Sequence, residues 1–173
     1  MVAIDRLYLD TNIFIIMVES SQEVARLLYE LVSLQVPGQP VFLCTSELSL
    51  AELIVRPCRE GDDELLRTYD EMLAPGGAFH VVPIDRQVLW GAAVTRARHR
   101  SLRLPDAIHV STAVASRCSH FLTADTDIPE RLNITGRQRE HDVGPYTLDR
   151  ILLDPQRPDP AILREIIMRR ASA

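Results

Sequence analysis

The sequence predicts an α/β protein, a three-layer α/β/α sandwich around a mainly parallel central sheet. Short apolar segments alternate along the chain with longer segments of helical periodicity. The apolar segments are mostly continuous rather than alternating with polar residues, as expected for strands that are covered on both faces. The chain has 173 residues, of which 46% are apolar, and this suits one sizeable core. We therefore expect a single domain over residues 1–173.

The apolar segments predict five strands, which cover residues 4–9, 40–45, 79–84, 120–124 and 146–152. The segments between them predict helices over residues 20–34, 46–56, 62–73, 86–100, 104–118 and 159–170, and the run after Asp10 opens another. The second of these helices should stop before Pro57, because the residue before a proline avoids the helical conformation. Pro105 suits the first turn of its helix. Residues 135–145 look the most loop-like part of the chain.

Composition excludes several functions. All 19 basic residues are Arg, so the chain lacks the Lys that a P-loop, a Schiff-base enzyme, a response-regulator receiver or a haloacid-dehalogenase-type phosphatase needs. The three isolated Cys argue against a disulfide framework or a zinc site. No apolar run approaches the roughly 18 residues of a membrane span, and no signal peptide is recognisable, so we expect a cytoplasmic protein without membrane contact.

Acidic residues follow the predicted strands at the edge where parallel α/β sheets place their reactive crevice. Asp10 follows the first strand, and Asp125 follows the fourth strand in "FLTADTDI". Glu52 lies about two turns into the helix after the second strand, and Asp106 lies at the start of a helix. These four carboxylates are expected to converge, although they are far apart in the sequence.

Four carboxylates in one pocket repel one another unless a cation neutralises them. Oxygen ligands with open water positions suit Mg²⁺ or Mn²⁺. Such an ion activates a bound water and polarises a phosphoryl oxygen, which is the chemistry of phosphodiester hydrolysis. Each acid also has an ordinary structural interpretation, as a turn residue, a helix cap, a first-turn acid or an exposed helix residue. Spacing alone leaves both interpretations open.

Four motifs together resemble the PIN-domain nucleases, and within them the VapC-type toxins of bacterial toxin–antitoxin pairs. They are the opening "LYLDTNIFI", the helix "SELSLAELIVRP", the helix "LPDAIHVSTAV" and the strand end "FLTADTDI". The resemblance covers about residues 4–130. Residues 135–173, which include the last predicted strand and helix at about 146–171, are less typical of the family, and the predicted loop at 135–145 is longer than in many relatives.

The resemblance implies a PIN-like fold and a metal-dependent endoribonuclease that uses Mg²⁺ or Mn²⁺. It implies that Asp10, Glu52, Asp106 and Asp125 are the catalytic acids and bind the metal. Further implied site residues are Asp127 as a fifth metal ligand, with Asn12 and Thr123 as polar supports. It also implies an RNA substrate, a cognate antitoxin protein and a homodimer. His109 has a possible role as general base, but local packing or hydrogen bonding is the simpler interpretation.

A basic segment precedes Asp106 and is the best local site for an RNA backbone in a chain of net charge −5. Its arginines are Arg96, Arg98, Arg100 and Arg103. A solvated helix end is the alternative interpretation. The apolar faces of residues 24–32 and 65–73 are either an antitoxin groove or parts of the core. The competing function is a catalytically inert PIN-like binding or scaffold module.

Overall fold

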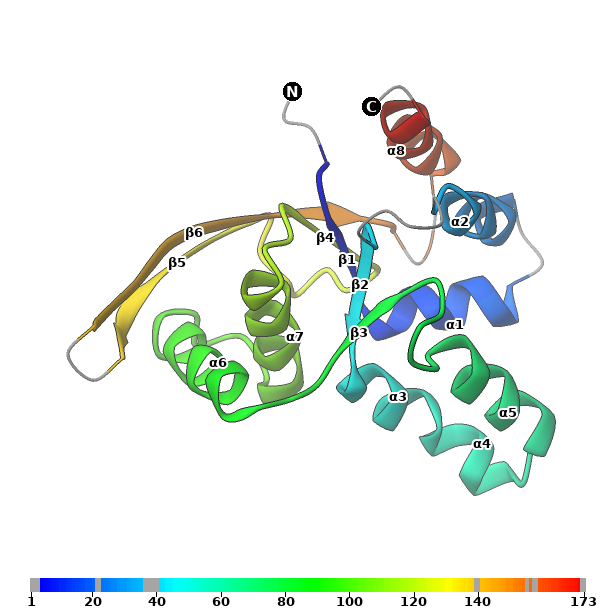
Figure 1. Ribbon diagram of the computed structural model, residues 1–173, viewed down its shortest axis with the longest axis horizontal. Helices are drawn as coiled ribbons and strands as arrows, with labels where there is room; N and C mark the ends of the chain where they lie inside the picture. The colour runs from blue at the N-terminus through cyan, green and yellow to red at the C-terminus, as the bar shows by residue number, and fades with distance from the viewer. Residues whose placement is uncertain are drawn as a thin grey trace.

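The computed structural model describes residues 4–20, 23–35, 41–138, 141–154, 156 and 159–171. Its fold is a three-layer α/β/α sandwich, which confirms the predicted class (Figure 1). The described strands form one six-stranded sheet with the order β3-β2-β1-β4-β6-β5. Neighbouring strands are parallel except that β5 and β6 are antiparallel. The strands are β1 (Leu7–Leu9), β2 (Leu43–Ser46), β3 (His80–Val82), β4 (His120–Thr123), β5 (Arg131–Gln138) and β6 (His141–Leu152).

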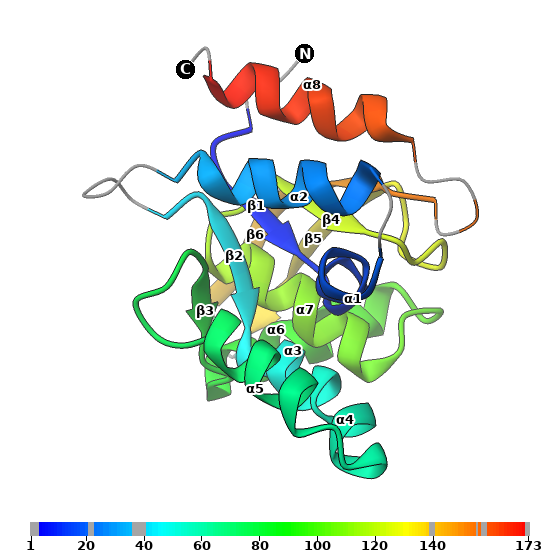
Figure 2. The same ribbon diagram turned by 90° about the vertical axis from the view of Figure 1, so that its right-hand side faces the viewer.

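Helices cover both faces of this sheet (Figures 1 and 2). α2 and α8 lie side by side over one face, and α6 and α7 lie together on the other. Within the described ranges, no helix is long and apolar enough to cross a membrane. The helices are α1 (Thr11–Glu19), α2 (Glu23–Ser33), α3 (Glu47–Leu53), α4 (Val55–Glu60), α5 (Asp63–Met72), α6 (Arg86–Arg98), α7 (Leu104–Ala115) and α8 (Pro160–Ala171).

Strand β1 is buried on both faces, which explains its continuous apolar sequence. Because side chains alternate along a strand, Leu7 and Leu9 join the core beneath α1, α2 and α8. Tyr8 points to the opposite face and joins a second core with residues of α7. The apolar faces of segments 24–32 and 65–73 also lie in the first core, so they are core faces rather than an open groove.

The helix predicted over residues 46–56 ends before Pro57, as expected, but a second helix that the sequence did not predict follows it directly. α3 ends at Leu53, and α4 then runs from Val55 through Pro57 to Glu60. Pro57 occupies the first turn of α4, where backbone N–H groups have no partner within the helix. The missing N–H of proline therefore costs α4 no hydrogen bond, which is why a new helix can include Pro57.

The prediction of a loop at residues 135–145 was wrong. β5 and β6 form a long antiparallel hairpin across this region and extend away from the body of the molecule (Figure 1). Residues 139 and 140, between the two strands, lie outside the described residues. Leu132, Ile134 and Leu148 supply the buried face of the hairpin. The polar residues on the other face hide this short alternation in the sequence. Residue 40, at the start of the second predicted strand, also lies outside the described residues.

Candidate metal-binding active site

Four acidic side chains from separate elements line one open cavity of about 400 Å³. Asp10 directly follows β1, and Asp125 follows β4, the strand next to β1. Glu52 lies on α3, which begins directly after β2, and Asp106 lies in the first turn of α7. The sheet order therefore gathers residues that are far apart in the sequence at its carboxyl edge. The cavity is also lined by Thr11, Asn12, Ile15, Val55 and His109.

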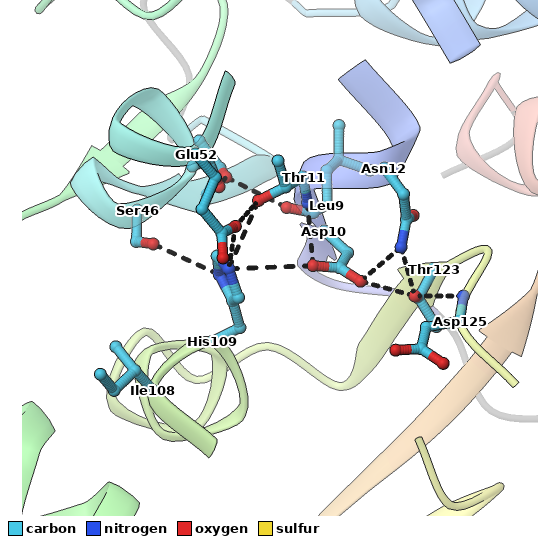
Figure 3. A network of polar contacts seen from close by, with 12 residues as sticks. Leu9, Asp10, Thr11, Asn12, Ser46, Glu52, Ile108, His109, Thr123 and Asp125 are labelled. Atoms are coloured by element: carbon cyan, nitrogen blue, oxygen red, sulfur yellow. Dashed lines mark hydrogen bonds and ion pairs between the residues drawn. The ribbon is translucent and has the colours of Figure 1, made fainter. Parts of the chain in front are cut away.

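Asp10 is buried and accepts three hydrogen bonds (Figure 3). Its Oδ1 accepts from the backbone N–H of Thr11 at 2.8 Å, which caps the start of α1. Its Oδ2 accepts from Asn12 Nδ2 at 2.8 Å and from Thr123 Oγ1 at 2.6 Å. Asn12 and Thr123, predicted as polar supports, thus hold this carboxylate in one orientation. Asn12 Oδ1 also accepts from the N–H of Ala124 at 2.8 Å, which ties α1 to the end of β4.

Glu52 is half-buried and is held through one of its two oxygens. Its Oε2 accepts from Thr11 Oγ1 at 2.5 Å and lies 3.0 Å from His109 Nε2. Burial by itself raises the pKa of Glu52, but the hydrogen bonds from His109 and Thr11 together outweigh it, and the net pKa is lowered. Both contacts reach Oε2, and the hydrogen bonds of the described residues do not involve Oε1.

Asp106 has a pKa above its usual range. Burial is the largest cause, and the negative charges of Asp125 and Asp10 add to it. The N–H of Arg103, which donates to Asp106 Oδ2 at 3.1 Å, opposes the rise. Asp125 Oδ1 accepts from the N–H of Asp127 at 2.7 Å. The like charges around Asp106 are a local excess of negative potential, which a cation would relieve.

The donor set fits Mg²⁺ or Mn²⁺, because it consists of carboxylate oxygens in an open cavity. In the part of the chain that the structure describes, no three His, Cys, Asp or Glu side chains are close enough to form a ready-made metal cage. Mg²⁺ commonly binds proteins through only one or two carboxylates and keeps several waters. The residues present therefore suit a hydrated ion rather than an enclosed one.

Besides the buried Thr123, five predicted residues lie away from the cavity lining. Asp127 is exposed, and its Oδ2 lies 3.9 Å from the guanidinium of Arg103. Arg103 is the helix cap before Asp106, so it is placed nearest the acids. Arg96 and Arg98 lie in the last turn of α6 and Arg100 follows that helix, all three exposed. Arg96 Nε donates to the carbonyl of Leu102 at 3.3 Å, which holds the segment between α6 and α7.

Sequence reasoning missed three side chains that shape the site: Tyr8, Thr11 and Ser46. Tyr8 lies within the apolar run predicted as the first strand, and nothing in that run signals a hydrogen-bond partner for it. Its hydroxyl lies 2.9 Å from His109 Nδ1, and Ser46 Oγ lies 3.4 Å from the same atom. Thr11 belongs to the same Asp-Thr-Asn motif as Asp10 and Asn12, but no role was predicted for it.

The fold and the cavity define an α/β domain whose polar site consists mainly of acidic side chains at the carboxyl edge of the sheet. Residues 7–132 match the PIN domain family, and the chain belongs to that family. This finding confirms the family resemblance that the four motifs indicate. No curated protein matches the chain.

Three solved structures have a similar fold. A toxin–antitoxin complex from Klebsiella pneumoniae matches at 22% identity and a TM-score of 0.51, with 70% of this chain and 87% of that chain covered. VapBC2 from Rickettsia felis, bound to a DNA fragment of its promoter, matches at 14% identity and a TM-score of 0.52, with 69% of this chain and 87% of that chain covered. FitAcB from Neisseria gonorrhoeae matches at 22% identity and a TM-score of 0.52, with 70% of this chain and 88% of that chain covered. At these identities the similarity shows the fold.

Proposed function

We propose that this protein is a Mg²⁺- or Mn²⁺-dependent endoribonuclease that hydrolyses RNA phosphodiester bonds, and that it is the toxin of a toxin–antitoxin pair. The observation that carries this proposal is the convergence of Asp10, Glu52, Asp106 and Asp125 on one cavity. Membership of the PIN domain family supports the nuclease activity. The similar structures, which include a toxin–antitoxin complex and VapBC2, support the biological role and an antitoxin partner.

In this proposal the four acids hold the ion, and when bound it activates water and stabilises negative charge at the phosphate. Asn12 and Thr123 orient Asp10 by hydrogen bonds. In this proposal Arg103 contacts a phosphate beside the cavity, and Arg96, Arg98 and Arg100 supply further positive charge. The exposed apolar side chains of Ile15 and Val55 line the same cavity and offer contact to a nucleotide or to an apolar side chain of the antitoxin.

The test compares the wild-type protein with Asp10→Asn and Asp106→Asn. RNA cleavage is measured with Mn²⁺, with Mg²⁺ and with EDTA. Each substitution should reduce the cleavage rate by at least about 100-fold, because the loss of several kcal/mol of charge stabilisation costs a factor of ten per ~1.4 kcal/mol. EDTA should abolish cleavage by the wild-type protein. Asp70→Asn, which changes an exposed acid on α5, is the matched control and should cleave normally.

Equal cleavage by all four proteins would reject the assigned site. A wild-type protein that cleaves no RNA and binds no Mn²⁺ would favour the inert binding module instead. The same variants also test the toxin role: expression of the wild-type protein should arrest growth of the host, and Asp10→Asn should relieve the arrest. Growth that continues despite full cleavage activity would separate the nuclease from the toxin.

A further inference from the structure

His109 is almost completely buried, at 2% exposure, and its ring contacts both the sheet and α3. It lies on α7, one turn after Asp106, and points toward Glu52 (Figure 3). On one side of the ring, Nε2 is 3.0 Å from Glu52 Oε2. On the other side, Nδ1 is 2.9 Å from the hydroxyl of Tyr8. Both ring nitrogens therefore have partners at hydrogen-bonding distance.

The chemistry of the two partners assigns the ring proton. A carboxylate accepts hydrogen bonds and cannot donate, so Nε2 carries a proton and donates to Glu52. In the neutral ring Nδ1 is then the acceptor, and the hydroxyl of Tyr8 donates to it. The result is a directional chain of hydrogen bonds from Tyr8 on β1, through His109 on α7, to Glu52 on α3.

This chain restrains a side chain that would otherwise be free to rotate. Glu52 projects from α3 with 34% of its side chain exposed, and its long side chain loses rotamer entropy when it is fixed. Thr11 and His109 both donate to Oε2. Together they hold that oxygen against the protein and leave Oε1 for the cavity.

We propose that His109 is a positioning residue, which fixes the rotamer of Glu52 so that Oε1 is presented to the cation. This role rests on the proposed function. The ring is not a general base in this geometry, because its Nε2 is already bonded to Glu52 and the side chain is only 3% exposed. Tyr8 has the supporting role of keeping the ring proton on Nε2, as carboxylate and hydroxyl partners of metal-site histidines do elsewhere.

The test measures Mn²⁺ affinity by calorimetry, together with RNA cleavage at saturating Mn²⁺. His109→Leu keeps much of the volume but removes both contacts, and it should weaken Mn²⁺ binding by about tenfold, the lower end of the range for residues that orient metal ligands. His109→Gln places an amide N–H near the position of Nε2 and should restore most of the affinity. Tyr8→Phe keeps the ring packing and should weaken binding by less than His109→Leu does.

A double-mutant cycle separates positioning from a general loss of structure. In the Glu52→Gln background, His109→Leu should cause no further loss of Mn²⁺ affinity, because the ligand that it orients is already gone. Additive losses would overturn the positioning role, as would normal Mn²⁺ binding by His109→Leu. If His109→Leu does not fold, Tyr8→Phe decides instead: weaker Mn²⁺ binding that disappears in the Glu52→Gln background supports the positioning role, and normal Mn²⁺ binding or additive losses overturn it. Absence of Mn²⁺ binding by the wild-type protein would overturn the proposed function along with this role.

Discussion

The carboxylate of Asp10 has two roles: it caps α1, and it lines the acidic cavity. Its Oδ1 caps α1 through the N–H of Thr11, so the ordinary interpretation of a helix-capping Asp is correct as geometry. Its Oδ2 accepts from Asn12 and Thr123, and the side chain lines the acidic cavity. At the scale of one residue, a cap and a candidate ligand are compatible, because a carboxylate has two oxygens with two lone pairs each.

Asp106 should destabilise the metal-free protein at neutral pH. Burial, with the charges of Asp125 and Asp10, raises its folded-state pKa. A group with a raised folded pKa contributes stability that is fully present below its unfolded pKa and is lost as the pH rises through the folded pKa. Asp106→Asn should therefore increase the Tm in EDTA at pH 7 by about 1–3 °C. The difference from wild type should shrink towards zero below the unfolded pKa.

Thermal unfolding followed by circular dichroism at several pH values measures this effect, with Asp70→Asn as the exposed-acid control. Added Mn²⁺ should raise the Tm of the wild-type protein more than that of Asp106→Asn, since a ligand that binds only the folded state stabilises it. A lower Tm for Asp106→Asn in EDTA would contradict the assigned electrostatic cost.

Much of the candidate site was predictable from residue types at strand ends. The positions of Asp10, Glu52, Asp106 and Asp125 followed from the rule that parallel sheets gather such residues at one edge. The donors that orient them were harder to predict. Thr11 and Tyr8 are common residue types, and a periodic pattern assigns a side chain to a face without naming its partner across 101 residues of sequence. For His109 the simpler interpretation was local packing or hydrogen bonding. Its contact with Glu52 depends on how α3 lies relative to α7, which the sequence does not show.

At the scale of elements, α6 and α7 pack closely at Gly91. A Cβ on Gly91 would lie 2.2 Å from Ser111 Oγ and 3.3 Å from Ser111 Cβ. Ser111 Oγ in turn donates to the carbonyl of Val88 at 2.7 Å, which joins the two helices. This pair sets the approach of α7, the helix that carries Asp106 and His109.

Gly91→Ala should destabilise the fold by about 1–2 kcal/mol, because overpacking outweighs the better helix propensity of Ala. Urea unfolding measures the change. Ser111→Ala alone should cost about 0.5–1.5 kcal/mol for the lost hydrogen bond. The double variant should be more stable than the sum of the single effects predicts, since removal of Oγ makes room for the new methyl group. Strict additivity would show that the two positions do not share this contact.

The hairpin of β5 and β6 is where the prediction of strands from the sequence failed. Continuous apolar strands and amphipathic helices were found within a few residues of their observed ends. Residues 135–145 were not recognised as strand, because Gly136, Gly144 and Pro145 interrupt the segment. Pairing between two strands, rather than local propensity, stabilises such a segment.

At the scale of the whole molecule, the family match ends at residue 132, but the core does not. α8 lies beyond the matched segment and packs along α2, where Arg164 pairs with Glu23. Leu163 and Ile166 of α8 join the same core as Leu7 and Leu9 of β1. The C-terminal region is therefore part of the layer that supports the first strand, and through it the position of Asp10.

Leu163→Ala should destabilise the protein by about 2–4 kcal/mol, because Leu163 is fully buried and a cavity would remain. Leu89→Ala, at a leucine that is 47% exposed on α6, is the matched control and should change stability little. Chemical unfolding of both variants gives the comparison. Similar small effects at the two positions would show that α8 contributes little to the core.

The order of the strands has a consequence for synthesis of the chain on the ribosome. β1 emerges first, yet one of its neighbours in the sheet is β4, and Asp10 bonds to Thr123 at the end of that strand. An unfinished polypeptide that stops before residue 120 lacks this partner and also lacks Asp125. The acidic cavity is therefore complete only after residue 125 has been translated, and products that terminate before this residue cannot assemble it.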